Sequence, residues 1–306
     1  MAWPNRTPNN FAVGAEAVPA GVARVTRTPV RQFSELGPVS FREHVIWRKR
    51  VLAGLRDSRP EATPRESRRL ESALDELSAT LLSIAATVAA TYGTPDLGNK
   101  RDPVDELVYI ILSRRTREGA YQAAFEALKS RYETWEALVD APAGEVEDII
   151  AFSGLGRRKT QSLKLALGAL LDRWGRCTLE PTRGWSDEDT RDFLCTLPEI
   201  GPKSAACVMV CALDRPAFPV DAHVGRVLER LAIFRVLDIE LDGTDHKQKQ
   251  HLLWDAVPPA LRYLLHVNLL MHGRLACRPR KPRCTSCALV DHCAYGLRAP
   301  TAAVSV

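Results

Sequence analysis

The chain has 306 residues, of which 45% are hydrophobic and 26% charged, and its formal net charge is +5. This composition is typical of a folded globular protein and excludes an intrinsically disordered chain, and the length favours two domains over one. The positive charge is compatible with nucleic-acid binding but too small to establish it. No apolar run approaches the ~20 residues of a membrane helix, and no secretory segment follows Met1. We therefore expect a cytoplasmic protein without a membrane partner.

The first part of the chain, residues 1–62, is expected to be an N-terminal extension that is largely disordered. Residues 1–38 are rich in Pro, Asn, Ala, Val and Arg and show neither helical nor strand periodicity. Within the extension, residues 41–56 can form a short basic amphipathic helix. The simplest interpretation of that helix is a surface element laid on the body of the protein.

From Thr63 onward the sequence predicts helix after helix and no strand, so the expected fold class is all-α. Thr63, Pro64 and Glu66 have the residue types of an N-cap, a first-turn proline and a capping-box partner. Apolar residues then recur at helical spacing until Gly93. Further helices are expected at residues 103–112, 117–130, 143–151, 157–174, 187–196, 203–213, 222–234, 247–256 and 259–272.

Two short glycine-containing turns interrupt this helical series, at residues 153–156 and 197–201. Each could be a plain connection between two helices. The second turn, however, opens onto a helix that begins at Pro202, and free N–H groups at a helix start favour a phosphate ligand. Lys203 follows immediately. It is either a phosphate contact or, with a pKa lowered by the helix start and by partial desolvation, a nucleophile able to form a Schiff base with a sugar.

Asp221 directly precedes the helix expected at residues 222–234. Its residue type suits an N-cap. An ionised aspartate can also stabilise the positive charge that develops at C1′ when a glycosidic bond breaks. His223 is explained more simply as a structural histidine of the core than as a catalyst.

Eight cysteines in a chain without an export signal argue against a disulfide framework. Four of them follow the spacing C-x6-C-x2-C-x5-C, and four thiolates in one short loop can enclose a zinc ion or a cuboidal iron–sulfur cluster. Only one CxxC pair is present, which weakens the zinc alternative. These four are Cys277, Cys284, Cys287 and Cys293. The scattered cysteines, expected to be small core residues, are Cys177, Cys195, Cys207 and Cys211.

A run of basic residues separates the first two cysteines of this group. A charge run is usually a solvated face. Two prolines limit the freedom of this one, however, and next to a metal cluster it would suit binding to a DNA backbone. The basic residues are Arg278, Arg280, Lys281 and Arg283.

The segments LPEIGPKSA and VDAHVGRV resemble the helix-hairpin-helix and Gly/Pro…Asp signature of base-excision DNA glycosylases. Together with the cysteine loop, this resemblance identifies the chain as a divergent member of the endonuclease III family, over residues 103–295. It implies that Lys203 attacks C1′, that Asp221 assists, and that the four clustered cysteines hold a [4Fe–4S] cluster. A lysine at this place also implies the bifunctional branch, which removes a base and then cleaves the strand by β-elimination.

Three residues depart from the family's pattern. Glu199 replaces the first glycine of the hairpin, Pro202 removes an N–H donor beside Lys203, and Arg115 stands where a glutamine usually fills the gap left by a flipped base. We therefore expect weakened or narrowed activity. Leu155 matches the family's wedging leucine. With the four basic residues of the cysteine loop, the residues expected to contact DNA are Arg115, Leu155, Leu197, Glu199, Gly201 and His223.

The sequence thus predicts an all-α, two-domain helix-hairpin-helix DNA glycosylase fold. A six-helix domain would span residues 101–215, an iron–sulfur domain would combine residues 63–98 and 216–298, and residues 299–306 would be a tail. The expected function is a monomeric, nucleoid-associated DNA glycosylase with AP lyase activity. It would excise damaged pyrimidines, in the first place oxidised ones, from double-stranded DNA. Two alternatives stay open: a [4Fe–4S] DNA-binding protein with little or no catalysis, and a monofunctional mismatch glycosylase.

Overall fold

The structure is a computed structural model that describes residues 41–57, 63–239, 241, 243 and 246–298. Within these residues the regular elements are α-helices and short 3-10 helices, and no strand occurs. The expected all-α class is therefore confirmed. The disorder predicted for residues 1–40 and 58–62, and the tail predicted at residues 299–306, lie outside the described residues.

The helices follow one another with short connections. The α-helices are α1 (Phe41–Asp57), α2 (Pro64–Tyr92), α3 (Pro103–Ser113), α4 (Glu118–Arg131), α5 (Trp135–Asp140), α6 (Ala143–Ile150), α7 (Gly156–Trp174), α8 (Asp187–Thr196), α9 (Pro202–Ala212), α10 (Ala222–Leu231), α11 (His246–Leu253), α12 (Arg262–Leu275) and α13 (Ala294–Arg298). The 3-10 helices are η1 (Ala151–Ser153), η2 (Glu180–Gly184), η3 (Ile233–Leu237), η4 (Pro259–Leu261), η5 (Cys284–Ser286) and η6 (Val290–His292).

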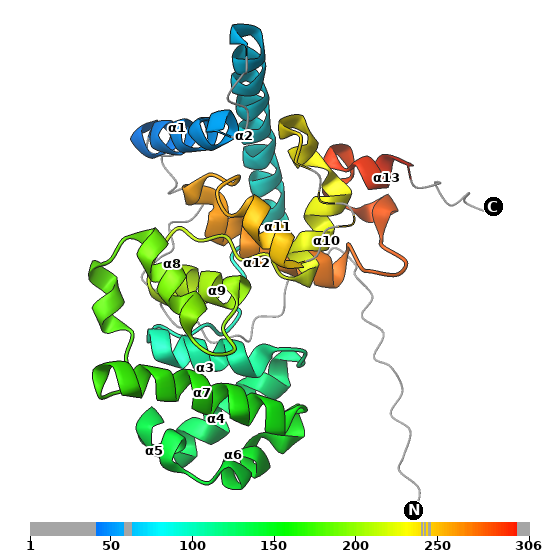
Figure 1. Ribbon diagram of the computed structural model, residues 1–306. Helices are drawn as coiled ribbons and strands as arrows, with labels where there is room; N and C mark the ends of the chain where they lie inside the picture. Colours follow the sequence, from blue (N-terminus) through cyan, green and yellow to red (C-terminus); the bar gives the residue numbers. More distant parts are fainter. Residues whose placement is uncertain (1–40, 58–62, 240, 242, 244–245, 299–306) are drawn as a thin grey trace, which may run out of the picture.

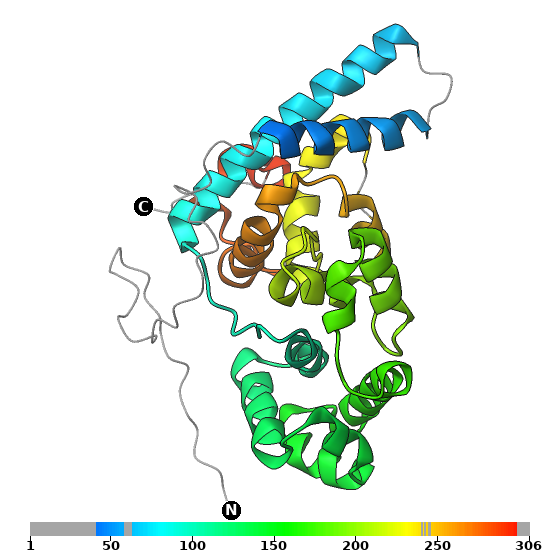
Figure 2. The same cartoon turned by 90° about the vertical axis from the view of Figure 1, so that its left-hand side faces the viewer.

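Two hydrophobic cores divide the described protein into two lobes (Figure 1; Figure 2). The hairpin lobe contains α3–α9, and its core is drawn from residues 104–217. The cysteine lobe contains α1, α2 and α10–α13, and its core is drawn from residues 47–97 and 218–293. The chain crosses between the lobes at Ala217 and Phe218, which are buried in different cores. The domain limits given above stay a prediction.

Helix α2 is the longest element and projects beyond the rest of the cysteine lobe (Figure 1). Its start forms the predicted capping box, because the Thr63 N–H donates to Glu66 Oε2 at 2.7 Å and the Glu66 N–H donates to Thr63 Oγ1 at 3.3 Å. By length and composition, α2 is the one described helix that could cross a membrane. Its buried face, from Leu70 to Val88, packs into the core of the lobe, as expected for the central helix of a globular domain.

Two differences from the predicted elements have local causes. Helix α5 was not predicted, because six residues are too few to show helical periodicity. Its Trp135 is buried, with the ring centroid 6.0 Å from that of Phe125. Helix α10 ends at Leu231 instead of continuing to residue 234, because Ala232 adopts a left-handed conformation with φ of 57°.

The short helix expected at residues 41–56 is present as α1, so this part of the N-terminal extension is ordered. Trp47 is 3% exposed and its Nε1–H donates to the carbonyl of Asp255 at 2.8 Å, which fixes α1 to the cysteine lobe. Arg50 forms an ion pair of 3.5 Å with Glu188 of α8, in the hairpin lobe. Helix α1 therefore contacts both lobes.

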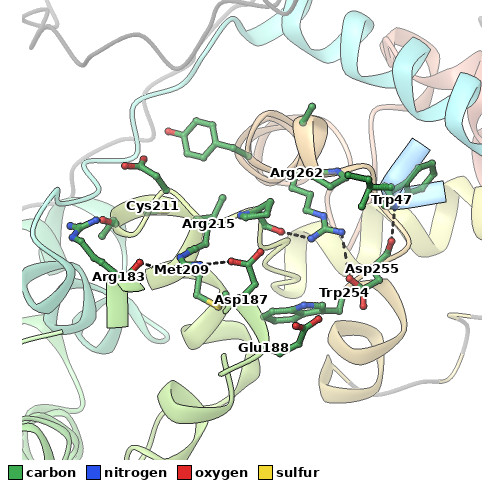
Figure 3. Close-up of a pocket in the computed structure, with 18 of the residues that line it drawn as sticks. Trp47, Arg183, Asp187, Glu188, Met209, Cys211, Arg215, Trp254, Asp255 and Arg262 are labelled. Carbon is green, nitrogen blue, oxygen red and sulfur yellow. Dashed lines mark hydrogen bonds and ion pairs between the residues drawn. The ribbon is translucent and has the colours of Figure 1, made fainter. Parts of the chain in front are cut away.

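A pocket of about 1010 Å³ lies at this seam between the lobes, on the side where α1 packs (Figure 3). Its charged side chains face one another: Arg215 Nη1 is 2.8 Å from Asp187 Oδ1, and Arg262 Nη2 is 3.6 Å from Asp255 Oδ1. Arg262 also donates to the carbonyls of Val257 and Pro216. Because these charges are satisfied within the protein, we interpret the seam pocket as a polar contact between the lobes.

Replacing Trp47 tests whether α1 is part of the folded body. We expect Trp47→Ala to lower the free energy of unfolding by about 3–5 kcal/mol, because a large buried aromatic side chain and its hydrogen bond are lost. Urea denaturation monitored by circular dichroism measures this change. Ile46→Ala is the matched control, because Ile46 is 52% exposed. Equal small losses in both variants would contradict the packing of α1.

Candidate active site

A cleft of about 820 Å³ opens between the two lobes and collects most of the residues singled out in the sequence. The hairpin lobe contributes Arg114, Arg115, Leu155, Lys159, Lys203 and Cys207. The cysteine lobe contributes Asp221, His223, His266 and Arg274. A salt bridge joins the two sides, because Arg274 Nη1 of α12 lies 2.7 Å from Glu118 Oε2 of α4.

Lys203 reaches this cleft from the first turn of α9. The turn before it is anchored by Leu197 and Ile200, each 4% exposed, and Gly201 is the N-cap of the helix. No side chain caps the start of α9, and Pro202 occupies its first turn. The remaining first-turn N–H groups are thus available to an external acceptor, which is the arrangement expected of a phosphate site.

The pKa of Lys203 differs from the expectation. Burial lowers the pKa of this amine, but the neighbouring Cys207 thiol and Asp221 carboxylate outweigh burial, so the pKa lies above its usual value. The sequence argument counted the helix start and desolvation and predicted a lowered pKa. It could not count Asp221, because this carboxylate comes from the other lobe. The resting lysine is therefore an ammonium.

Asp221 faces Lys203 from the N-cap of α10, as its residue type predicted. Its Oδ1 accepts hydrogen bonds from the N–H groups of His223 and Val224, both at 2.8 Å. Burial raises the pKa of Asp221, but Lys203, His266 and these backbone donors outweigh that effect and lower it. The carboxylate is thus ionised, fixed in direction and electrostatically paired with the lysine.

His266 is a cleft residue that the sequence argument missed, since a lone histidine in an apolar helix gives no signal. Its Nδ1 lies 2.9 Å from the carbonyl of Pro219. A carbonyl only accepts, so Nδ1 carries the proton and Nε2 is left as an acceptor. Burial lowers the pKa of His266 to about 4, and the ring is neutral at neutral pH.

Arg115 and Leu155 lie on neighbouring loops at the wall of the cleft, and their contact with DNA stays a prediction. Both adopt left-handed backbone conformations, with φ of 50° and 56°, and both side chains are exposed. Phe152, on the loop of Leu155, is 60% exposed and was not singled out in the sequence. Apolar side chains held out in this way can enter a DNA base stack.

The other residues that were expected to contact DNA lie in different surroundings. The side chain of Leu197 is buried in the core of the hairpin lobe and anchors the turn, and the expected contact of this residue with DNA stays a prediction. His223 lines the cleft, and its Nδ1 lies 3.2 Å from Arg226 Nη2. It is therefore not a core histidine, which was the simpler interpretation. Gly201 lies at the start of α9 with φ of −97°, which any residue can adopt.

Glu199 is turned away from the start of α9. Its backbone is left-handed, with φ of 64°. Its carbonyl accepts from Arg114 Nη2 at 2.5 Å, and its carboxylate accepts from the hydroxyl of Ser162 at 3.5 Å. The negative charge is therefore directed toward α7, which explains how the hairpin accommodates it beside a phosphate site.

The four clustered cysteines line one small pocket in the cysteine lobe: Cys277, Cys284, Cys287 and Cys293. Arg230 Nη1 donates to Cys277 Sγ at 3.2 Å, and the N–H of Gly296 donates to Cys293 Sγ at 3.3 Å. Across the described part of the chain, no three His, Cys, Asp or Glu side chains lie close enough to hold one metal ion. The thiols thus share a pocket without meeting at a single point.

The basic loop between Cys277 and Cys284 does not line the cleft. Arg278, Arg280, Lys281 and Arg283 are exposed. The loop backbone is tied to the lobe by Arg230, which donates to the carbonyls of residues 278 and 279 at 2.8 and 3.0 Å. This loop therefore presents a fixed, positively charged surface.

The comparisons with known proteins agree with one another. Residues 108–256 match the family model described as HhH-GPD superfamily base excision DNA repair protein. The chain is 31% identical over 179 residues to an Arabidopsis thaliana protein provisionally named a DNA glycosylase, covering 58% of this chain and 59% of that protein. The matched part is thus less than two thirds of that relative's length. An endonuclease III of Thermotoga maritima is 27% identical over 194 residues, covering 63% of this chain and 84% of the relative.

A solved structure supports the same architecture. A trapped endonuclease III–DNA covalent intermediate superposes with a TM-score of 0.61 over 72% of this chain and 97% of that chain, at 24% sequence identity. This likeness establishes the fold, and the predicted two-domain helix-hairpin-helix fold class is confirmed.

Glu199 gives a direct test of strain in the hairpin. We expect Glu199→Gly to be more stable than Glu199→Ala by about 1 kcal/mol, because only glycine adopts the left-handed conformation without a steric cost. Both variants remove the negative charge, so both should bind duplex DNA more tightly. Thermal unfolding and fluorescence anisotropy measure the two effects. Equal stability of the two variants would show that the backbone at this position is not strained.

Proposed function

We propose that the chain is a DNA glycosylase with AP lyase activity, on the basis of its match to the HhH-GPD superfamily of base excision DNA repair proteins over residues 108–256. The observation that carries the proposal is the opposition of Lys203 and Asp221 across the cleft. An amine and a carboxylate held together are the groups needed to attack a sugar carbon and to stabilise the charge that develops there. The likeness to endonuclease III supports the same chemistry.

In the proposed reaction the unprotonated amine of Lys203 attacks C1′ of a flipped nucleotide. The bond between C1′ and the base breaks, and the base leaves with the bonding electrons and gains a proton. The sugar ring opens, giving an imine between Lys203 and C1′. Loss of a proton from C2′ then expels the 3′ phosphate by β-elimination, and water releases the lysine. Asp221 stabilises the cationic sugar and the protonated lysine.

DNA would lie across the cleft with its backbone on positive groups of both lobes. The uncapped start of α9 offers N–H groups to one phosphate. The exposed basic loop at residues 278–283 offers side chains to the backbone further along. Leu155 and Arg115 would enter the duplex at the site of the flipped nucleotide. We propose damaged pyrimidines, oxidised ones first, as substrates, and a monomeric protein acting in the cytoplasm.

We propose that the four clustered cysteines hold a [4Fe–4S] cluster. The donor set fits this group, since four thiols line one pocket whose sulfurs receive hydrogen bonds from Arg230 and Gly296. Four thiolates in one short loop with a single CxxC pair suit a cuboidal iron–sulfur cluster better than the paired ligands of a structural zinc site. When bound, the cluster would supply cross-links that hold the basic loop. Arg230, which bonds both to Cys277 and to the backbone of this loop, would hold the loop in place beside the cluster.

A second candidate function is a DNA-binding protein with little catalysis. One observation favours it: the raised pKa of Lys203 makes the reactive, unprotonated amine a minor species at neutral pH. A monofunctional mismatch glycosylase is disfavoured, because Lys203 offers an amine to the sugar. The two remaining candidates differ in a covalent step that can be captured.

Borohydride trapping decides between them. We expect the protein to form a covalent adduct with duplex DNA containing an abasic site, because reduction of the imine joins the lysine nitrogen to C1′. Lys203→Gln should abolish the adduct. Lys129→Gln is the control, because Lys129 pairs with Asp105 outside the cleft. DNA binding without an adduct in the wild-type protein would exclude the lyase and leave the DNA-binding candidate.

The metal proposal has an independent measurement. We expect the purified protein to be brown, with absorption at about 400 nm and about four irons and four sulfides per chain. Cys284→Ser should reduce both the absorption and the iron content. Cys195→Ser, at a half-buried cysteine of the hairpin lobe, should reduce neither. Stoichiometric zinc without iron would contradict the cluster.

A further inference from the structure

A buried lysine near the cleft takes no part in the chemistry proposed above. Lys159 lies in the first turn of α7 and is 3% exposed. Its Nζ is 2.6 Å from Thr116 Oγ1, 3.0 Å from Ser153 Oγ and 3.2 Å from the carbonyl of Ser153. An ammonium has three donors, and these three oxygens use all of them. The nitrogen is therefore not free to act as a second nucleophile.

The surroundings of this ammonium are unusual because they are uncharged. All three acceptors are neutral oxygens, and no salt bridge to Lys159 occurs in the described part of the chain. Burial lowers the pKa of Lys159. A buried charge without a partner of opposite charge is costly. A lysine kept here must therefore do something that an apolar residue of similar size could not.

The three acceptors belong to two separate loops of the hairpin lobe. Thr116 lies in the turn after α3, and Ser153 ends η1, before α7. Thr116 Oγ1 is also 2.9 Å from the carbonyl of Arg114 and 3.3 Å from that of Ser153. The side chain of Lys159 thus closes a small polar network that joins one loop to the other.

Each loop carries a strained residue beside this network. Arg115 precedes Thr116, and Leu155 follows Ser153 by two residues. Both are left-handed, a conformation that costs a residue other than glycine about 1–2 kcal/mol. Such conformations persist only where the surroundings hold them. The Lys159 network bonds to a residue close to each of them, because Thr116 follows Arg115 and Ser153 lies two residues before Leu155.

We propose that Lys159 is a positioning residue that locks the loops of Arg115 and Leu155 together, so that both side chains enter the DNA duplex as one unit. This inference rests on the proposed function and deepens it. Extruding a nucleotide requires the gap to be filled as it opens. Two loops moving independently would fill the gap only part of the time. Lys159 acts before the chemical step, because it sets the distance between the two side chains that enter the duplex.

The test uses Lys159→Met, which keeps the length of the side chain and removes the ammonium. Lys164→Met is the matched control. Lys164 lies on the same helix, and its Nζ donates to the carbonyls of Leu138, Val139 and Ala141, away from the two loops. Both variants lose an ammonium bonded to neutral oxygens, which is buried in Lys159 and half-buried in Lys164, so general loss of stability affects both. Thr116→Val, which breaks the network from the other loop, is a second and milder variant.

The probe is a duplex with a stable abasic analogue opposite 2-aminopurine, whose fluorescence rises when its stacking is disturbed. At saturating protein we expect a clear signal for wild type and Lys164→Met, and a greatly reduced signal for Lys159→Met and Thr116→Val. Affinity measured by anisotropy should change little, because backbone contacts remain. Single-turnover trapping on abasic duplex should slow by about tenfold to a hundredfold in Lys159→Met.

Wild-type fluorescence in Lys159→Met at saturation would overturn the inference. So would equal loss of signal in Lys164→Met, since that would show a purely structural effect. Failure of the lyase is distinguishable from failure of this inference. A wild-type protein that forms no covalent adduct loses the proposed reaction, whereas the fluorescence of the uncleavable duplex still reports whether Lys159 controls insertion.

Discussion

The ammonium of Lys203 and the carboxylate of Asp221 belong to opposite lobes, so their attraction depends on how the two cores are held together. Asp221 is fixed by backbone N–H groups of α10, and Lys203 by the anchored turn before α9. Between them the chain crosses from one core to the other, where buried Arg262 binds the carbonyl of Pro216. The seam contacts and the Arg274–Glu118 salt bridge also join the two lobes.

This pairing has a chemical consequence. Burial alone would favour the neutral amine, and the carboxylate across the cleft favours the ammonium, which prevails in the resting protein. The pKa of Asp221 is lowered and that of His266 is about 4, so neither side chain readily accepts a proton from Lys203. In the proposed lyase reaction, substrate would have to shift this balance toward the free amine. Positive charge developing on the sugar next to Asp221 would do so, because it competes with the lysine for the same carboxylate.

Three of the residues with a strained backbone lie on the loops around the proposed DNA-binding face. Arg115, Leu155 and Glu199 all adopt left-handed conformations without being glycine. Arg115 and Leu155 lie beside the Lys159 network, and the carbonyl of Glu199 accepts from Arg114. Strain of this kind is a common property of functional loops.

Many features of this protein could be predicted from short runs of consecutive residues. The capping box at Thr63, the N-cap at Asp221, the lysine after the hairpin and the spacing of four cysteines all depend on neighbours in the chain, and could be predicted from it. Other features could not be predicted from the sequence. They are the burial of Leu197, the direction of the Lys203 pKa shift, and the positions of His266 and Lys159. Each of these is decided by atoms from distant segments, because burial and electrostatic pairing depend on distance in space and not on separation along the chain.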